Sequence, residues 1–85
     1  MNPLYVTFHS VSSALLMEAQ MQPICGCRVV PVPRALSSSC GYAAEVEMEE
    51  ALLVAMLQED DAIEWEGVYR QKEDGSFTQI IAYTQ

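Results

Sequence analysis

The sequence is poor in basic residues and in histidine. Its 85 residues include four Lys and Arg against twelve Asp and Glu, with one His, and the formal net charge is −8. A surface that binds nucleic acid needs clustered Lys and Arg, and this chain has no such cluster. One His also leaves no complete set of residues for a metal triad or a Ser-His-Asp relay. We therefore expect no nucleic-acid partner, no metal and no cofactor.

Long apolar runs and phosphate-binding glycine motifs are also missing. No apolar run approaches the roughly 20 residues that span a bilayer, and the N-terminus lacks a basic region followed by an apolar one. Neither G-x-x-x-x-G-K-[ST] nor G-x-G-x-x-G occurs. Three cysteines are an odd number, which argues against a fully paired secreted disulfide scaffold and favours reduced thiols. We expect a cytoplasmic protein with no membrane contact.

The acidic residues that are present are unevenly distributed. Eleven of the twelve lie between Glu45 and Asp74, and none lies between Ala19 and Ala44. The basic residue Arg34 falls in that acid-free segment, as does a loop of three serines and a cysteine. This distribution predicts an acidic molecule with one neutral or locally positive face that contains the loop.

Hydrophobic periodicity predicts alternating strands and helices. Period-two alternation predicts a strand over residues 4–8, and clustered valines predict another over 28–32. Between them, Ser10 or a following serine can cap a helix that ends near Pro23, with Ala14, Met17 and Met21 at helical spacing on its buried face. Further strands are expected over 42–46 and 65–70.

A second helix is expected between these last two strands. Its first turn is predicted to hold Glu47, Glu49 and Glu50. Its buried face is predicted to comprise Met48, Leu52, Leu53, Met56 and Leu57. After a turn at 73–76, residues 77–83 alternate as a fifth strand.

This order of elements predicts an α+β fold of the ferredoxin-like kind. Strand, helix, strand, strand, helix, strand is the split βαβ sandwich, an antiparallel sheet with two helices on one face. We expect a single ferredoxin-like domain over residues 1–72 and a C-terminal β-hairpin extension over 73–85. The extra strand can cover a sheet edge or pair with a second copy of the chain, which would give a homodimer.

The serine-cysteine loop contains the residues best suited to a chemical function. Prolines at 31 and 33 stiffen its start, and Gly41 permits a backbone angle that a side chain would disfavour. Free amides and hydroxyls around Ser37, Ser38 and Ser39 could hold an anion or stabilise a thiolate on Cys40. The alternative is a polar connecting loop with an ordinary cysteine.

The predicted fold places possible helpers near Cys40. His9, Ser10 and Arg34 should converge on the same end of the sheet, and the dipole of the first helix would favour the thiolate. His9 could add charge or move a proton there, or it could simply belong to a local helix cap.

The two other thiols are expected elsewhere. Cys25 and Cys27 should lie at the opposite end of a strand of about five residues at roughly 3.3 Å each. That separation exceeds the span of a disulfide, so neither can readily pair with Cys40. They are treated as secondary thiols, and a redox pair remains an alternative.

Two segments carry a family resemblance. V-P-V-P-R-A-L-S-S-S-C-G, preceded by Y-V-T-F-H-S, and the later W-E-G-V-Y-R resemble the sulfur or selenium carrier-like proteins over about residues 4–70. The resemblance implies that Cys40 carries the chalcogen as a persulfide or selenopersulfide. It also implies that Arg34, the serines at 37–39 and Gly41 shape the loop.

The resemblance further implies the kind of partners. A donor such as a cysteine desulfurase would load Cys40, and an unknown acceptor protein would unload it, so the chain would be an accessory carrier rather than a stand-alone enzyme. One alternative is a non-catalytic regulatory or protein-interaction module with a structural Cys40 loop. Another is a thiol-disulfide enzyme that uses Cys25 and Cys27.

Overall fold

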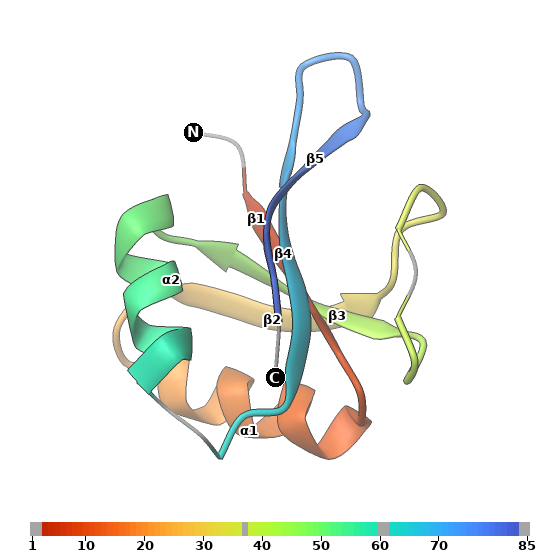
Figure 1. The fold of residues 1–85 in the computed structure, drawn as a ribbon. Helices are drawn as coiled ribbons and strands as arrows, with labels where there is room; N and C mark the ends of the chain where they lie inside the picture. The colour runs from red at the N-terminus through yellow and green to blue at the C-terminus, as the bar shows by residue number, and fades with distance from the viewer. Residues whose placement is uncertain (1–2, 37, 60–61, 84–85) are drawn as a thin grey trace.

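Five strands and two helices follow one another along the residues that the computed structural model describes, which are 3–36, 38–59 and 62–83 (Figure 1). In chain order they are β1 (Leu4–Phe8), α1 (Val11–Met21), β2 (Gly26–Pro31), β3 (Tyr42–Glu47), α2 (Glu50–Glu59), β4 (Trp65–Gln71) and β5 (Phe77–Ala82).

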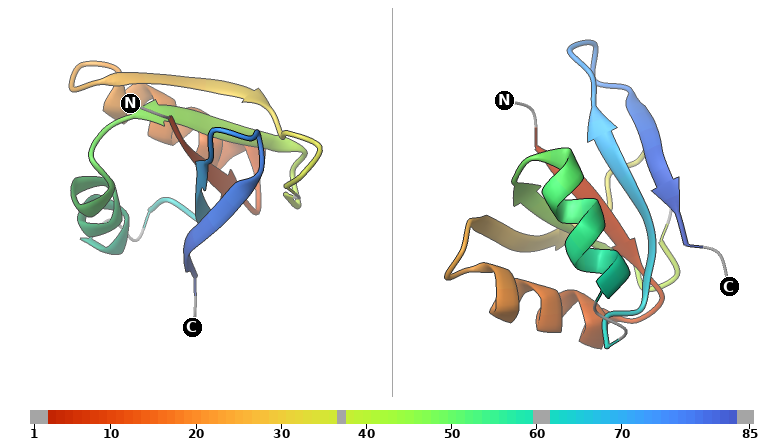
Figure 2. Two further views of the ribbon diagram at one scale, coloured as in Figure 1. Left: turned by 90° about the horizontal axis from the view of Figure 1, so that it is seen from above. Right: turned by 60° about the vertical axis from the view of Figure 1, so that its left-hand side comes forward.

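The strands form one antiparallel sheet in the order β2-β3-β1-β4-β5. On β1, the central strand, Val6 lies opposite Ala44 of β3 and Val68 of β4. The two helices and the strongly twisted β4–β5 hairpin are seen from two further directions in Figure 2. The α+β class, the βαββαβ order and the added C-terminal strand are those predicted from the sequence.

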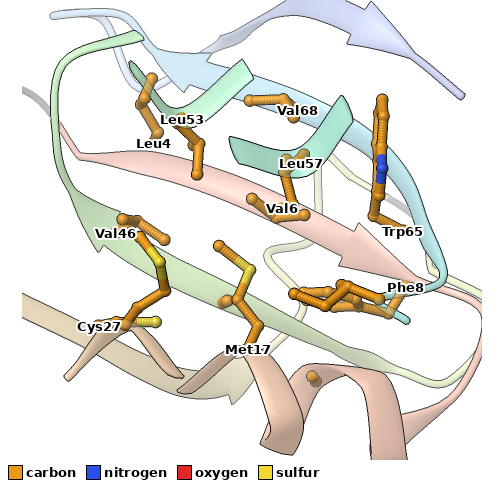
Figure 3. Packing of buried hydrophobic residues seen from close by; sticks show 14 residues of the cluster. Leu4, Val6, Phe8, Met17, Cys27, Val46, Leu53, Leu57, Trp65 and Val68 are labelled. Atoms are coloured by element: carbon orange, nitrogen blue, oxygen red, sulfur yellow. The ribbon is translucent and has the colours of Figure 1, made fainter. Parts of the chain in front are cut away.

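The core lies between the helices and the sheet. Val6 and Phe8 of β1 are fully buried, and they pack with Met17 of α1 and with Leu53 and Leu57 of α2 (Figure 3). These are the positions that the helical and strand periodicities assign to the core, because side chains of one parity point to one face of a strand. Burial of this apolar surface is the main source of stability.

The opposite face of β1 is buried too. Tyr5 and Thr7 are 8% and 1% exposed, respectively, although strand alternation points them away from the helices. The Tyr5 ring meets Phe77 of β5 edge to face, with centroids 5.4 Å apart. The C-terminal strand therefore contributes to the cover of the second face as well as extending the sheet.

The second helix differs from its prediction in start and orientation. It begins at Glu50, while Glu47, predicted in its first turn, is the last residue of β3. Leu53 and Leu57 are buried as expected, but Leu52 is 56% exposed. The prediction for Leu52 is wrong because Leu53 and Leu57, four residues apart, set the face that packs on the core, and Leu52 lies about 100° around the helix from Leu53 on its exposed side.

One edge of the sheet is closed by side chains of α1. The Val29 amide on β2 donates to a Glu18 carboxylate oxygen at 2.8 Å, and the Gln22 side-chain amide donates to the Cys27 carbonyl at 3.1 Å. Pro31, at the end of the same strand, has no amide hydrogen. Groups that an edge strand would otherwise offer to another chain are thus already occupied or missing.

In the part of the chain that the structure describes, neither α1 nor α2 has the length and hydrophobicity needed to cross a bilayer.

Candidate functional site

The β2–β3 loop lies at one end of the sheet, to the right in Figure 1. The Val32 amide donates to the Gly41 carbonyl at 3.0 Å and closes the base of the loop. Two tight turns follow within it: Leu36 donates to Pro33, and Gly41 donates to Ser38 at 3.2 Å. Gly41 has a φ of 80°, a backbone angle that glycine adopts at little cost. The loop is therefore a short, internally hydrogen-bonded excursion that returns directly into β3.

The Cys40 sulfur lies at the start of this return, partly exposed and partly packed against the core. Its Sγ is 3.5 Å from the Tyr42 carbonyl oxygen and 3.5 Å from the Ser38 Oγ. A carbonyl can only accept, so the thiol donates its hydrogen to Tyr42. The sulfur is thus neither enclosed in an aliphatic pocket nor tied into a disulfide.

Ser38 joins the loop to the end of β1. Its hydroxyl donates to the Phe8 carbonyl at 2.9 Å and accepts from the Phe8 amide at 3.4 Å. A serine hydroxyl has one hydrogen, so in this arrangement its lone pairs, rather than its hydrogen, face Cys40. If Cys40 lost its proton, rotation of the same hydroxyl would offer the sulfur a donor.

A carboxylate from β4 holds the next residue of the loop. Ser39 donates its backbone amide to one oxygen of Glu66 at 2.9 Å and its hydroxyl to the other at 2.7 Å. The His9 Nδ1 lies 3.5 Å from the same carboxylate. Burial raises the Glu66 pKa, but the two Ser39 hydrogen bonds, the nearby His9 and the Ser38 hydroxyl together lower it by more, so the pKa lies below the ordinary value.

Glu66 changes two expectations about the loop. The face around the serines is not free of acidic groups, because β4 brings this carboxylate from a distant part of the sequence. The Ser39 amide, one of the groups considered for an external anion, is donated to the protein's own side chain.

The predicted helper residues have different surroundings. Ser10 caps α1, since its hydroxyl accepts from the Ser13 amide at 3.4 Å. His9 is brought to the loop through Glu66, with about half of its side chain exposed. Arg34 is exposed, and within the described residues its side chain forms no hydrogen bond or ion pair. Ser37 lies outside the described residues.

The other two thiols lie at the opposite end of β2 and line a cleft of about 650 Å³: Cys25 directly precedes the strand, and Cys27 is its second residue. Burial and the nearby Glu47 raise the Cys25 pKa. Burial, Cys25 and Glu18 raise the pKa of Cys27 to about 11. Both thiols are therefore protonated near neutral pH, where the thiolate is the reactive form. Across 3–36, 38–59 and 62–83, no three His, Cys, Asp or Glu side chains are grouped to hold a metal ion.

Glu66 is the residue at this end that the sequence reasoning missed. It is the second residue of β4, and an antiparallel arrangement brings the start of β4 to the end of β1. That position, inside the W-E-G-V-Y-R segment, is the signal that could have identified it.

Three comparisons with known proteins complete the description. A family model described as "Putative Se/S carrier protein-like" matches residues 4–70, which include every element from β1 to β4 except the last residue of β4. The searches of curated proteins and of solved structures gave no match.

Proposed function

The chain belongs to the Se/S carrier protein-like family, and on this premise we propose that it carries one sulfur or selenium atom on Cys40. The carried form is a persulfide or selenopersulfide. A donor such as a cysteine desulfurase loads it, and an acceptor protein removes the atom.

The observation that carries this proposal is the placement of the Cys40 sulfur. It lies on a short loop at the end of the sheet, accessible in part, and its hydrogen-bonding neighbours among the described residues are the Tyr42 carbonyl and the Ser38 hydroxyl. Cys25 and Cys27 are poorer candidates because their surroundings keep them protonated. A carrier needs a reachable nucleophile rather than an enclosed pocket, which suits a domain of this size.

The transfer step is a balanced thiol exchange. Cys40 gives its proton to water, and the thiolate attacks the outer sulfur of the donor's persulfide. A new sulfur–sulfur bond forms on Cys40, the bond within the donor persulfide breaks, and the donor cysteine leaves as a thiolate. The outer sulfur passes between two thiolates, so no external oxidant or reductant is needed.

Ser38 is suited to both states of Cys40. With the thiol protonated, its hydroxyl donates to Phe8. With an anionic sulfur, a rotation about the Ser38 side chain redirects that hydrogen toward Cys40, at a separation of 3.5 Å. The proposal places the protein in a reducing compartment, such as the cytoplasm, where unpaired thiols persist.

Mass spectrometry after incubation with a cysteine desulfurase and cysteine tests the proposal. We expect the intact protein to gain one sulfur atom that a reducing thiol removes. Cys40→Ser should gain none, and Cys25→Ser, the matched control at the other end of the sheet, should gain it normally. Selenocysteine in place of cysteine gives the selenium version of the assay. Equal labelling of Cys40→Ser and wild type would refute the assignment to Cys40.

A further inference from the structure

A second surface, separate from the Cys40 loop, is a groove between α2 and β5. It has a volume of about 590 Å³, and apolar side chains dominate its lining. Ala51, Val54 and Ala55 form its wall on α2, while Ile80 and Ile81 form its wall on β5. The two elements that border it can be followed in Figure 2. The groove takes no part in the Cys40 chemistry described above.

The groove exists because α2 has two apolar stripes. Leu53 and Leu57 face the core and are buried. The positions 51, 54, 55 and 58 follow the i, i+3, i+4, i+7 spacing of a second helix face, directed toward β5. Ala51 and Ala55 on that face are exposed and small, so the surface between helix and strand is hollow.

Acidic residues stand at both ends of α2, and two of them line the groove itself. Glu49 and Glu50 line the groove where α2 begins, and Glu59 is the last residue of the helix, next to the lining residue Gln58. Arg70 pairs with Glu50 at 3.0 Å. Within the described residues, neither Glu49 nor Glu59 forms an ion pair. The sequence between Arg34 and Arg70 contains no Lys or Arg.

We propose that this groove binds a helical segment of a partner protein, apolar along one face and carrying Lys or Arg toward its ends. The apolar face fits the alanine and isoleucine walls, and the cations complement the unpaired carboxylates. The ten residues of α2 extend about 15 Å, which corresponds to a partner segment of roughly three turns. A second copy of this chain is a poorer occupant, because each copy carries a net charge of −8 and the same acidic ends.

The test is an NMR titration of the full chain with a synthetic peptide of about four helical turns. The peptide has leucines at i, i+3, i+4 and i+7 and lysines at both ends. A scrambled peptide of the same composition keeps the charge but has no apolar face, and a third peptide replaces every lysine with glutamate. We expect the first peptide to shift the amide signals of α2 and β5, and the other two to bind far more weakly.

Matched variants separate groove binding from general attraction to an acidic protein. Ala55→Lys and Leu52→Lys change the charge equally at exposed helix positions, but only Ala55 lines the groove. Lysine is a good helix former, so both variants should keep α2. We expect Ala55→Lys to weaken binding by about tenfold and Leu52→Lys by about twofold or less. Ala51→Lys provides a second groove variant with the same expectation as Ala55→Lys.

Several results would overturn the proposal. If Leu52→Lys and Ala55→Lys weakened binding equally, or if the scrambled peptide bound as well as the first peptide, net charge alone would explain the binding. Sedimentation showing a dimer that Ala55→Lys dissociates would identify a second copy as the occupant. Peptide binding to Cys40→Ser should match wild type, so this test succeeds or fails independently of the carrier proposal.

Discussion

Ser39 and Glu66 are joined by two hydrogen bonds, one to each carboxylate oxygen, although 27 residues separate them in the sequence. The pair fastens the residue before Cys40 to the start of β4. The residue before Ser39, which is Ser38, is bound to the end of β1 through its hydroxyl. The segment that presents the sulfur is therefore held by two strands of the sheet as well as by its own turns.

Glu66→Gln should loosen this attachment. Glutamine cannot accept both Ser39 hydrogen bonds with a charged group, and we expect a loss of about 1 kcal/mol in the free energy of unfolding. Urea denaturation measures the loss, and faster alkylation of Cys40 by iodoacetamide should accompany it. Glu64→Gln, two residues earlier on an exposed side chain, is the control and should change stability by less than about 0.5 kcal/mol. Identical alkylation rates in both variants would contradict the role of Glu66.

The same carboxylate predicts a dependence on acidic pH. Its pKa is lower in the folded state than the ordinary value of 4.5, so the unfolded chain binds more protons as the pH falls. The contribution of Glu66 is complete above pH 4.5 and is lost as the pH drops from there toward the folded-state pKa. Unfolding free energies measured between about pH 6 and pH 3 should fall less steeply in Glu66→Gln. Parallel curves for the variant and wild type would count against this assignment.

Alkaline pH should also destabilise the fold. Burial is the main cause that raises the pKa of Cys27 from 9.0 to about 11 and that of Tyr5 from 10.0 to about 12. Both groups are held neutral in the folded state, so the unfolded chain loses its protons first. Their stabilisation is complete below pH 9 and disappears as the pH rises toward 12.

The stabilisation lost when either group is fully ionised is on the order of 2–3 kcal/mol in the free energy of unfolding. Tyr5→Phe keeps the buried ring and removes the titrating hydroxyl, so the upper part of the alkaline loss should shrink. Urea denaturation across that pH range tests the prediction. A Tyr5→Phe curve with the full wild-type slope would show that another group is responsible.

The two left-handed glycines offer a matched comparison. Gly41 and Gly75 have φ values of 80° and 88°, and a Cβ added at either would meet no atom within 4 Å. Alanine at either position should therefore cost about 1–2 kcal/mol through the backbone alone. Only Gly41→Ala should change the alkylation rate of Cys40, since Gly75 lies in the β4–β5 turn. A similar change in Gly75→Ala would mean that the rate follows global stability.

Adjacent leucines on α2 test the packing of the core. Leu53 is fully buried and Leu52 is 56% exposed. Leu53→Ala should cost about 2–5 kcal/mol, because it removes buried methyl groups and leaves a cavity. Leu52→Ala should stay within about 0.5 kcal/mol of wild type. If thermal unfolding showed comparable losses of stability in the two variants, a different face of α2 would have to pack against the core.

Short-range patterns were sufficient to predict the fold. Alternation along residues 4–8 predicted β1, and the helical spacing of Ala14, Met17 and Met21 predicted the buried face of α1, because both patterns depend only on local backbone geometry. The three helix residues lie in the core with alternate residues of β1, whereas the burial of Tyr5 and Thr7 on the other face was not predicted. The order of elements then left one economical arrangement of the sheet. The rotation of α2 was harder to predict, because apolar residues fill more of its surface than the core can cover.

The candidate site was predictable only in part. The order of strands brings the end of β1 and the β2–β3 loop together, and Ser38 does contact Phe8. The contact with Glu66 depends on the register of β4 against β1, which shifts between Thr7 and Phe8. Such a bulge has no clear mark in strand alternation, so alternation alone could not show that Glu66 faces the loop, and only its place at the start of the W-E-G-V-Y-R segment pointed to it. The functional roles assigned to Cys40 and its loop remain predictions for the assays above.

The closure of the β2 edge limits how this protein can assemble. Strand pairing between chains requires an edge with free amides and carbonyls, and Glu18, Gln22 and Pro31 remove several of these from β2. With β2 obstructed in this way, β5 is the edge left more open to strand pairing. A pair formed through β5 would bury that edge in both copies, so growth of a longer strand-paired array would require the obstructed β2 edge.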